Sequence, residues 1–411
     1  MARIVVIGAG AAGTMAAIFA ASAGAEALLL ERTPDGGRKI LISGGGRCNI
    51  LPAQLDESRF VTDSSPHTLR NIVRSWPLAQ QIAFFERELR LPLVEETESG
   101  KLFPSTQRAR DVRDGLLALA ASRGVRFQPN AAVIDASPSA TDGGWRVMLG
   151  SGPPIEADAL IMATGGLSVP QTGSDGQGLR IVEQLGHTIH PTYAALTPIT
   201  AEPAPFGHLA GVSLSVTITA QDGTRSATAT GGMLCTHRGY SGPAVLDVSH
   251  VVVRSRPDSP SRVRVRWADL EEGEWAEALR PHGTHTVARA LRDRLPERLA
   301  LALLGVAGVE PARTLAQLRR EERVKLLDVL ERGTLHWTGH EGYKKAEVTG
   351  GGVSLAEIDP LTMESRRHPG LFLCGEMLDA FGPIGGYNFV WAWVTGRAAG
   401  LGAVGGGGAG R

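Results

Sequence analysis

The first part of the chain alternates short apolar runs with longer segments of helical character. Residues 3–7, 27–31 and 159–163 are almost continuously apolar, which is typical of buried strands in a parallel sheet. An alanine-rich segment at residues 13–23 lies between the first two runs and predicts a helix. Strand, helix and strand in this order predict a βαβ unit.

Further elements with the same patterns follow. Residues 68–90 and 108–123 have helical periodicity, and residues 125–133, 145–149 and 371–374 are predicted to be strands. These elements favour an α/β fold of the Rossmann type around a mainly parallel sheet.

The pattern changes after about residue 190. Residues 212–219 and 262–267 alternate apolar and polar side chains, which predicts half-exposed antiparallel strands. Residues 284–304 and 311–331 are charged and predominantly helical in pattern. The apolar, glycine-rich pattern returns near Val348.

We therefore predict a discontinuous nucleotide-binding domain that an inserted domain interrupts. The nucleotide-binding domain comprises residues 1–190 and 348–411, and the insert comprises residues 191–347. The glycine-rich residues 402–411 have little to bury and are predicted to be disordered.

Charge and cysteine usage limit the classes of partner. The 42 Lys and Arg residues balance 42 Asp and Glu residues, so the chain lacks the basic surplus that favours phosphate binding. We expect no nucleic-acid partner, and no membrane partner because no segment has the length and apolarity of a span. The three cysteines are far apart, and no secretory signal precedes the first strand, so we expect a cytoplasmic protein of unknown oligomeric state.

A G-x-G-x-x-G motif follows the first predicted strand. Gly8 makes the tight turn, Gly10 lets the backbone approach a pyrophosphate, and Gly13, next to Ala12, permits close helix packing. Glu31 ends the second strand, where a carboxylate can accept hydrogen bonds from a ribose. Together these features predict dinucleotide binding.

The βαβ unit alone does not distinguish NAD from FAD. No second motif of this kind follows another strand, and two distant glycine-rich segments remain to be explained. Residues 37–49 contain three successive glycines, and residues 374–388 contain a glycine pair that opens an apolar helix. A surface loop and an ordinary strand–helix turn are the alternatives, but both segments suit a flavin nucleotide.

The chain resembles the BaiN-like flavoproteins, also described as aminoacetone oxidase family FAD-binding enzymes or NAD(P)/FAD-dependent oxidoreductases. The resemblance covers nearly the whole chain in order. It rests on GRKILISGGGRCN at 37–49, SGKLFP at 99–104, ATGGLSVPQTGSDGQG at 163–178, THRGYSGPAVLDVS at 236–249, TGGGVSLAEIDPLTMESR at 349–366, and CGEMLD and GGYN within 374–388.

The resemblance implies a glutathione-reductase-like FAD domain whose insert contains a β-barrel (about 191–270 and 333–347) and a helical part (about 271–332). It implies non-covalent FAD, with the glycine motif at the pyrophosphate, Glu31 and Arg32 at the adenosine ribose, and the GGYN segment at the flavin ring. One departure is Val390, where many relatives have glutamine. The implied cofactor-binding residues are Gly8, Gly10, Ala12, Gly13, Glu31, Arg32, Lys39, Gly45, Arg47, Cys48, Val133, Thr164, Gly165, Gly375, Glu376, Asp379, Gly386, Tyr387 and Asn388.

The expected function is an FAD-dependent oxidoreductase in which flavin N5 exchanges a hydride with a small organic substrate. We favour a reductase that draws electrons from transiently bound NADH or NADPH. An amine oxidase that produces peroxide is the alternative within this class, and a non-catalytic flavin-binding protein is the alternative outside it. An RNA-modifying flavoprotein is disfavoured by the neutral charge. His237 and Tyr240 are candidate proton donors, although a structural loop is the better interpretation, and no catalytic residue is assigned.

Other reactive residues have simpler explanations. His187 and His190 have HxxH spacing, as do His282 and His285, but neither pair has a nearby third ligand, so we predict no metal site. Cys48 has no partner cysteine at short spacing and therefore no resolving thiol for disulfide chemistry.

Overall fold

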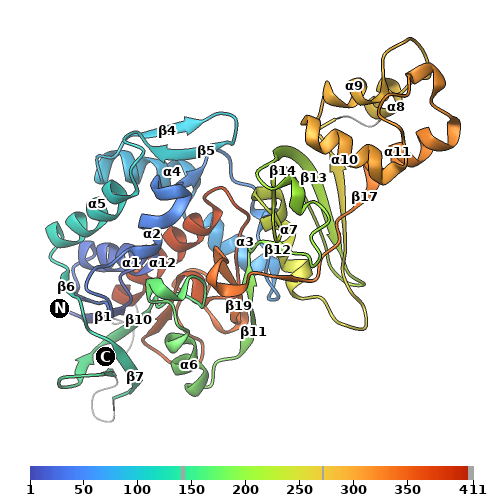
Figure 1. Ribbon diagram of the computed structural model, residues 1–411. Coiled ribbons are helices and arrows are strands. Elements are labelled where there is room, and N and C mark those ends of the chain that lie inside the picture. Colours follow the sequence, from blue (N-terminus) through green and yellow to red (C-terminus); the bar gives the residue numbers. More distant parts are fainter. Residues whose placement is uncertain (140–143, 271–272, 406–411) are drawn as a thin grey trace. The chain divides into compact units, whose positions relative to one another are not determined.

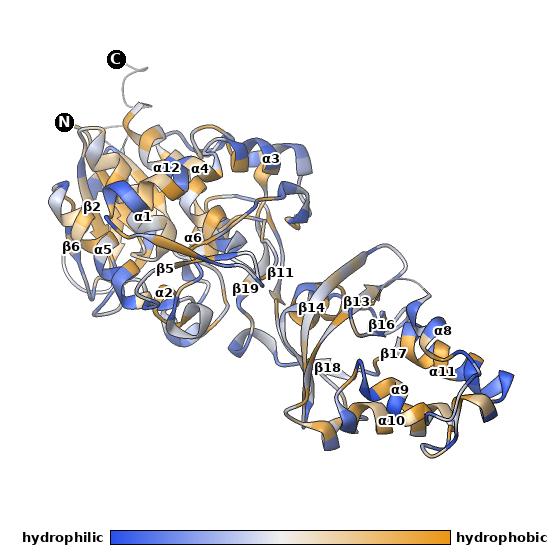
Figure 2. Ribbon diagram, turned by 90° about the horizontal axis from the view of Figure 1, so that it is seen from above, coloured by the Kyte–Doolittle hydropathy of each residue, from blue (hydrophilic) through white to orange (hydrophobic). Residues whose placement is uncertain are grey.

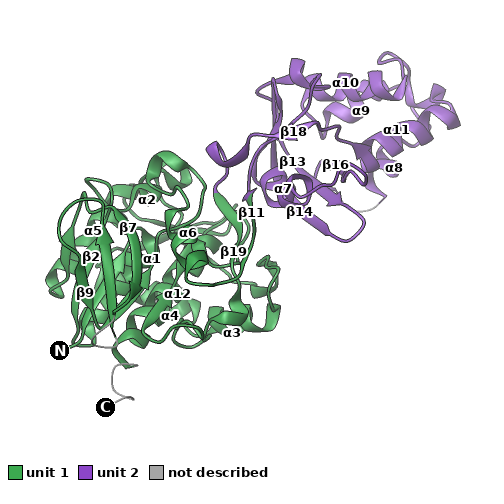
Figure 3. Cartoon of the chain, turned by 90° about the horizontal axis from the view of Figure 1, so that it is seen from below, with its two compact units in different colours: residues 1–193, 348–411 green, residues 194–347 purple. Residues whose placement is uncertain are grey.

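The computed structural model describes residues 1–139, 144–270 and 273–405, which form two compact units (Figures 1 and 3). Unit 1 consists of Met1–Tyr193 and Val348–Arg411, and unit 2 consists of Ala194–Glu347. Each unit has its own hydrophobic core. Unit 2 begins three residues after the predicted start of the insert at residue 191 and ends at the same residue.

A five-stranded parallel sheet forms the centre of unit 1. Its strand order is β20-β10-β1-β2-β6, with β1 and β10 in the middle region and both almost fully buried. This arrangement confirms the predicted Rossmann-type fold class. The strands are β1 (Arg3–Ile7), β2 (Glu26–Leu30), β6 (Arg126–Gln128), β10 (Ala159–Met162) and β20 (Leu371–Leu373).

The first and last helices of the chain pack directly on each other. In Figure 1, α1 (Ala11–Ser22) in blue lies beside α12 (Tyr387–Gly405) in red. A Cβ atom at Gly396 would lie 2.3 Å from the carbonyl oxygen of Ala12, and Gly400 faces the next turn of α1 at the same distance. Glycine is therefore required for this approach, and it joins the two ends of the chain.

The rest of unit 1 surrounds this centre with two small antiparallel sheets, a strand pair and short helices. In Figure 2 the strands and helices around β2 and α1 are coloured largely as hydrophobic. The strand pair, β11 with β19, lies where the chain passes between the two units. One small sheet consists of β3 (Leu51–Pro52), β5 (Lys101–Pro104) and β4 (Leu93–Glu96), and the other consists of β7 (Val133–Pro138), β8 (Trp145–Leu149) and β9 (Ile155–Ala157). The strand pair is β11 (Ile189–Ala195) with β19 (Val348–Val353). The helices are α2 (Arg38–Ile42), α3 (Pro66–Arg74), α4 (Leu78–Ala83), α5 (Ala109–Ser122) and α6 (Gln177–Gln184).

Unit 2 contains a seven-stranded antiparallel sheet in the order β17-β16-β13-β14-β15-β12-β18, in the region of the predicted barrel. Helix α7 packs on β13 and β14 and shares their hydrophobic core. The strands are β12 (Ile199–Thr200), β13 (Ser213–Gln221), β14 (Ser226–Thr236), β15 (Gly239–Ser241), β16 (Arg262–Trp267), β17 (Gly333–Thr334) and β18 (Gly339–His340), and the helices are α7 (Pro243–Val253), α8 (Glu274–Ala278), α9 (Val287–Arg292), α10 (Glu297–Ala307) and α11 (Arg320–Arg332).

Three predicted elements are interrupted, two of them by proline and one by a residue with left-handed φ. The predicted helix at 68–90 is divided at Pro77, because proline cannot donate the backbone hydrogen bond that a continuing helix needs. Pro296 divides the predicted helix at 284–304 in the same way. The predicted strand at 125–133 is two strands, β6 and β7, because Asn130 between them has a left-handed φ of 56°.

The predicted disordered tail is partly wrong. Helix α12 continues to Gly405, and Ala403 is 2 % exposed in the core of unit 1. A Cβ atom at Gly402 would lie 2.6 Å from the carbonyl oxygen of Thr362, so close packing orders these glycine-rich turns. Residues 406–411 lie outside the described part of the chain. No helix in the described part has both the length and the hydropathy that a membrane span needs.

The packing of α12 on α1 gives a first testable prediction. Gly396→Ala places a methyl group against the backbone of α1 and is expected to lower the free energy of unfolding by about 1–3 kcal/mol. Gly305→Ala in α10 is the matched control, because its Cβ meets no atom within 4 Å, and it should stabilise the protein slightly. Thermal melting of the two variants makes the comparison, and equal melting temperatures would contradict the packing argument.

Candidate dinucleotide site

The glycine turn between β1 and α1 combines tight packing with an open face. Gly8 has a φ of 101°, and a Cβ atom there would lie 2.5 Å from the carbonyl oxygen of Ala163. A Cβ atom at Gly13 would lie 1.8 Å from the carbonyl oxygen of Gly8. Gly10 differs, because its φ is an ordinary −77° and no atom lies within 4 Å of its Cβ position. The open space lies at the N-terminus of α1, where backbone N–H groups attract phosphate.

Glu31 lies beside this turn, directly after β2, and is 8 % exposed. Its carboxylate accepts hydrogen bonds from Ala9 N at 2.9 Å, Thr33 N at 2.8 Å and Thr33 Oγ1 at 2.7 Å. These bonds fix the carboxylate next to the glycine turn. A carboxylate has about four acceptor positions, so one more donor, such as a ribose hydroxyl, can be accommodated.

A partly buried polar network links four distant segments around Glu376. Lys39 Nζ donates to Glu376 Oε2 at 2.6 Å and to Ser168 Oγ at 2.7 Å. Glu376 Oε1 accepts from Ser168 Oγ at 2.5 Å, from Thr349 N at 3.0 Å and from Thr349 Oγ1 at 2.9 Å. The Lys39–Glu376 pair spans 337 residues of sequence and joins the two glycine-rich segments that the sequence singled out.

The glycines that precede Cys48 form a left-handed turn. Gly44, Gly45 and Gly46 have φ values of 54°, 68° and 85°, and the Cβ position of Gly45 faces open space. Cys48 itself is fully buried. Burial raises the pKa of its thiol to about 12, although a hydrogen bond with Ser43 opposes this effect. Cys48 is therefore a neutral thiol at physiological pH, unlike the low-pKa cysteines of redox sites.

Two predicted arginines are held by carboxylates of neighbouring segments. Arg32 pairs with Asp175 at 2.5 Å, and about two fifths of its side chain is exposed. Arg47 pairs with Glu96 at 2.9 Å, and its guanidinium lies 4.2 Å from the ring centroid of Phe103. Both side chains keep donors that these contacts do not use, so each could still meet a phosphate.

The segment after β10 contains an unsatisfied buried group. The Oγ1 atom of Thr164 is buried and has no hydrogen-bond partner among the described residues. Gly165 and Gly375 follow strand ends with left-handed φ values of 74° and 76°, and a Cβ atom at Gly375 would lie 2.8 Å from the Cβ of Ala12. Val133 starts β7 and is 9 % exposed. An unpartnered hydroxyl near a glycine cradle fits a site that a polar ligand completes.

Asp379 is fixed by a loop rather than facing open space. It is 2 % exposed, and its Oδ2 atom accepts from Thr62 Oγ1, Asp63 N, Ser64 N and Ser64 Oγ at 2.8–3.0 Å. No local sequence pattern predicts this contact, because more than 300 residues separate the loop from Asp379. Asp379 therefore positions the 62–64 loop at the C-terminal segment.

The GGYN segment is also tightly bonded to its surroundings. The side chain of Asn388 exchanges two hydrogen bonds of 2.9 Å with the backbone of Gly382. The hydroxyl of Tyr387 accepts from the backbone N–H of Asp56 at 3.3 Å. A Cβ atom at Gly386 would lie 2.6 Å from the backbone of Leu51. These contacts hold the start of α12 against the N-terminal part of unit 1.

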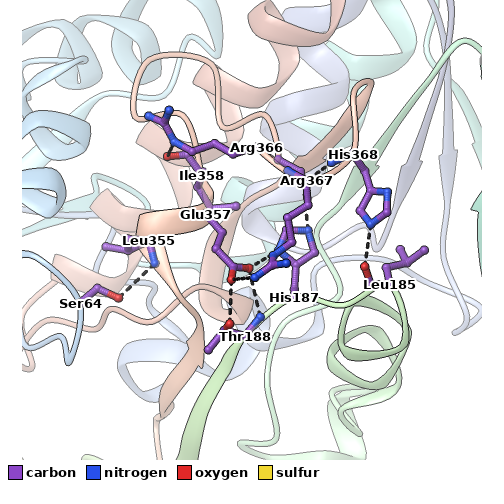
Figure 4. Close-up of polar contacts among 11 residues, drawn as sticks. Ser64, Leu185, His187, Thr188, Leu355, Glu357, Ile358, Arg366, Arg367 and His368 are labelled. Carbon is purple, nitrogen blue, oxygen red and sulfur yellow. Dashed lines mark hydrogen bonds and ion pairs between the residues drawn. The ribbon is translucent and has the colours of Figure 1, made fainter.

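The two HxxH histidines do not converge. Figure 4 shows that His187 points at Glu357, with Nδ1 2.8 Å from the carboxylate, and its Nε2 lies 3.0 Å from Ser365 Oγ. His190 instead lies 3.3 Å from Ser64 Oγ, beside Asp379. His187 lies in the loop after α6, whereas His190 lies in β11, so the two side chains meet different neighbours. In unit 2, Tyr240 is buried in the core and His237 is exposed.

The glycine turn, the fixed carboxylate at the end of β2 and the parallel sheet define a Rossmann dinucleotide-binding protein. The chain belongs to the family described as the HI0933-like protein Rossmann domain, whose model matches residues 2–402. This finding confirms the resemblance drawn from the sequence motifs, and it makes the protein an FAD-dependent oxidoreductase.

Two curated relatives match almost the whole chain. The ribosomal RNA dihydrouridine synthase of Escherichia coli is 33 % identical over 95 % of this chain and 95 % of its own. The 3-dehydro-bile acid delta(4,6)-reductase of Clostridium scindens is 31 % identical over 98 % of this chain and 99 % of its own.

Solved structures share the fold at low identity. A 3-ketosteroid delta1-dehydrogenase from Sterolibacterium denitrificans has a TM-score of 0.55 and 12 % identity, with 98 % of this chain and 99 % of that chain covered. The E. coli quinol fumarate reductase FrdA has a TM-score of 0.53 and 16 % identity, with 100 % and 71 % covered.

The open space at Gly10 gives a second prediction. Gly10→Ala should fold normally, because its φ is ordinary and its Cβ meets no protein atom, but the methyl group should obstruct the pyrophosphate. We expect FAD affinity to fall at least about tenfold, which corresponds to about 1.4 kcal/mol. Fluorescence titration of apoprotein with FAD measures this loss, with Gly305→Ala as the control. Undiminished affinity would remove the pyrophosphate from this turn.

The cluster in Figure 4 gives a third prediction, on pH. Burial alone would raise the pKa of Glu357, but hydrogen bonds from Arg367, Thr188 and His187 lower it to about 2. Burial lowers the pKa of His187, although its bond to Glu357 opposes this. Both groups therefore stabilise the fold above their unfolded pKa values, and this stability is lost as the pH falls through 6.5 for His187 and through 4.5 toward 2 for Glu357.

Glu357→Gln should accordingly melt at a lower temperature than the wild type at pH 7, and the difference should shrink as the pH falls from 5 toward 3. The exposed Glu98→Gln serves as the control for a lost charge. A difference that stays constant with pH would refute the role assigned to the Glu357 carboxylate.

Proposed function

We propose that this chain is an FAD-dependent reductase that uses NADH or NADPH to reduce a carbon–carbon double bond conjugated to a carbonyl group. The overall reaction balances as substrate, NAD(P)H and one proton giving the saturated substrate and NAD(P)⁺. When bound, FAD supplies the two-electron hydride chemistry that connects the donor to the acceptor bond.

The observation that carries this proposal is the shared chemistry in the names of the two relatives. Dihydrouridine differs from uridine by two hydrogens across a ring double bond that is conjugated to a carbonyl. A delta(4,6)-reductase of a 3-dehydro bile acid likewise acts on double bonds that are conjugated to a ketone. Each relative is matched over at least 95 % of both chains, which supports the same type of reaction for this chain.

The cysteines support direct use of an external donor. Cys48, Cys235 and Cys374 are the three cysteines of the chain, and each is buried and free. Burial raises the pKa of all three thiols. No thiol pair is available to relay electrons, so a nicotinamide that reacts at the cofactor itself is the simpler donor.

Within this proposal, the residues of unit 1 hold and orient the cofactor. The amides at Gly10 would bind the pyrophosphate, and Glu31 would accept from the adenosine ribose. Glu376 accepts four hydrogen bonds from Lys39, Ser168 and Thr349, and these bonds would fix this part of the site beside the ribityl chain. The rigidity of this network would keep the ring in one orientation.

A fourth prediction tests the reaction. Anaerobic NADH or NADPH should bleach the flavin absorption band of the purified protein, and adding cyclohexenone, a 3-oxo-4-ene steroid or a uridine-containing RNA should restore it. Cyclohexanone, which has the carbonyl but lacks the double bond, is the matched control and should leave the band bleached. Gly10→Ala supplies the cofactor-depleted protein control.

The other outcomes are distinct. Bleaching by amines alone, with peroxide formed on exposure to air, would replace the reductase with an amine oxidase. Bleaching by neither nicotinamides nor amines would favour a non-catalytic flavin-binding protein. A small-molecule substrate and the absence of a nucleic-acid partner both stay predictions, and whole-chain charge supports the second of them.

A further inference from the structure

The sheet of unit 2 has one buried and one solvent-facing side. Val216, Ile218 and Ala220 of β13 are fully buried and pack with α7 in the core of the unit. The alternate residues of the same strand, Thr217 and Thr219, project to the opposite side and are partly exposed. The helix that packs closely on β13, α7, lies on the buried side.

Three arginines follow one another on this side. Arg262, Arg264 and Arg266 occupy every second position of β16, whereas Val263 and Val265 between them are buried. Arg262 and Arg264 are exposed, and Arg266 is partly exposed. Positions two apart in a strand place their side chains about 7 Å from one another along the same face.

Cross-strand pairing adds a hydroxyl-bearing row beside each of two arginines. Arg264 pairs with Thr219 of β13, which pairs in turn with Thr228 of β14. Arg266 pairs with Thr217, which pairs with Thr230. The threonine hydroxyls of each row lie 2.9–3.0 Å apart. Three arginines of β16 and four threonines of β13 and β14 thus lie on one side of the sheet. We call them the arginine–threonine face: Arg262, Arg264, Arg266, Thr217, Thr219, Thr228 and Thr230.

The arginines of this face lack anionic partners. Among the described residues, Arg262, Arg264 and Arg266 form no ion pair, whereas Arg280, Arg292 and Arg332 elsewhere in unit 2 each pair with a carboxylate. The Nε atom of Arg266 is buried and has no hydrogen-bond partner in the described part of the chain. The cross-strand rows themselves contain no carboxylate.

We propose that the arginine–threonine face binds the phosphate backbone of RNA. Guanidinium and hydroxyl donors are the groups that commonly contact phosphate and sugar oxygens, and a row of unpaired cations matches a polymer of regularly spaced anions. The rows carry no aromatic side chain for base stacking, so this contact anchors RNA without reading its sequence. The proposal rests on the proposed function, because an RNA substrate would supply the conjugated double bond as a uridine.

This inference departs from the expectation of no nucleic-acid partner. That expectation used the charge of the whole chain, which sums to zero. A sum over 411 residues does not detect three unpaired arginines that tertiary structure places in one row on one face. Binding to a polyanion depends on such local charge rather than on the total.

The experiment compares two triple variants of the full-length, FAD-loaded protein. R262Q/R264Q/R266Q removes the three guanidinium groups of the face and leaves the buried Val263 and Val265 between them unchanged. R280Q/R292Q/R332Q is the matched control, since it removes the same charge from arginines that are already paired. Fluorescence anisotropy with a labelled uridine-containing RNA stem–loop gives the affinity at several salt concentrations. The single variant R264Q changes one exposed residue and keeps the test interpretable if the triple variant does not fold.

We expect the face variant to bind the stem–loop at least about tenfold more weakly and to reduce the slope of log affinity against log salt by about two to three. R264Q should reduce this slope by about one, and the control triple variant should retain the wild-type slope. Equal binding by all proteins, or binding of the face to phosphatidylserine vesicles in place of RNA, would overturn the proposal. NAD(P)H-dependent reduction of cyclohexenone is measured in parallel. A wild-type protein that does not catalyse this reduction would refute the proposed function, whatever its affinity for RNA.

Discussion

The close approach of the two chain ends is the constraint on which this structure depends. Gly13 lets α1 start directly against the turn at Gly8, and Gly396 lets α12 touch the backbone of α1. This packing brings residues 374–388 to the glycine turn, although the whole of unit 2 lies between them in the sequence. The polar counterpart is the Lys39–Glu376 pair, which closes the same assembly at 2.6 Å.

Unit 1 can carry an inserted domain because the strand that leaves it and the strand that returns to it lie side by side. Strand β11 leads toward unit 2 and strand β19 returns from it, and the two strands pair with each other. Unit 2 also has an independent core, so its solvent-facing surfaces can vary without disturbing the cofactor site. This division of labour is consistent with relatives that share the fold but are named for substrates as different as ribosomal RNA and a bile acid.

Local features of the site were predictable from sequence, and its long-range contacts were not. The strand at residues 3–7, the glycine motif and Glu31 follow from short-range patterns that the fold class requires. The partners of Glu376 and Asp379 could not be derived, because each pair joins segments hundreds of residues apart. Composition likewise could not reveal a charged face, since that depends on which side of a strand each residue occupies.

A double-mutant cycle on Lys39 and Glu376 tests the central claim most directly. FAD affinity is measured for Lys39→Met, Glu376→Gln and the double variant. If the pair assembles one flavin site from both ends of the chain, each single variant weakens FAD binding, and the double variant loses less binding free energy than the sum of the two. FAD affinity that is unchanged in all three variants, or a folded wild-type protein that binds no FAD, would contradict the account.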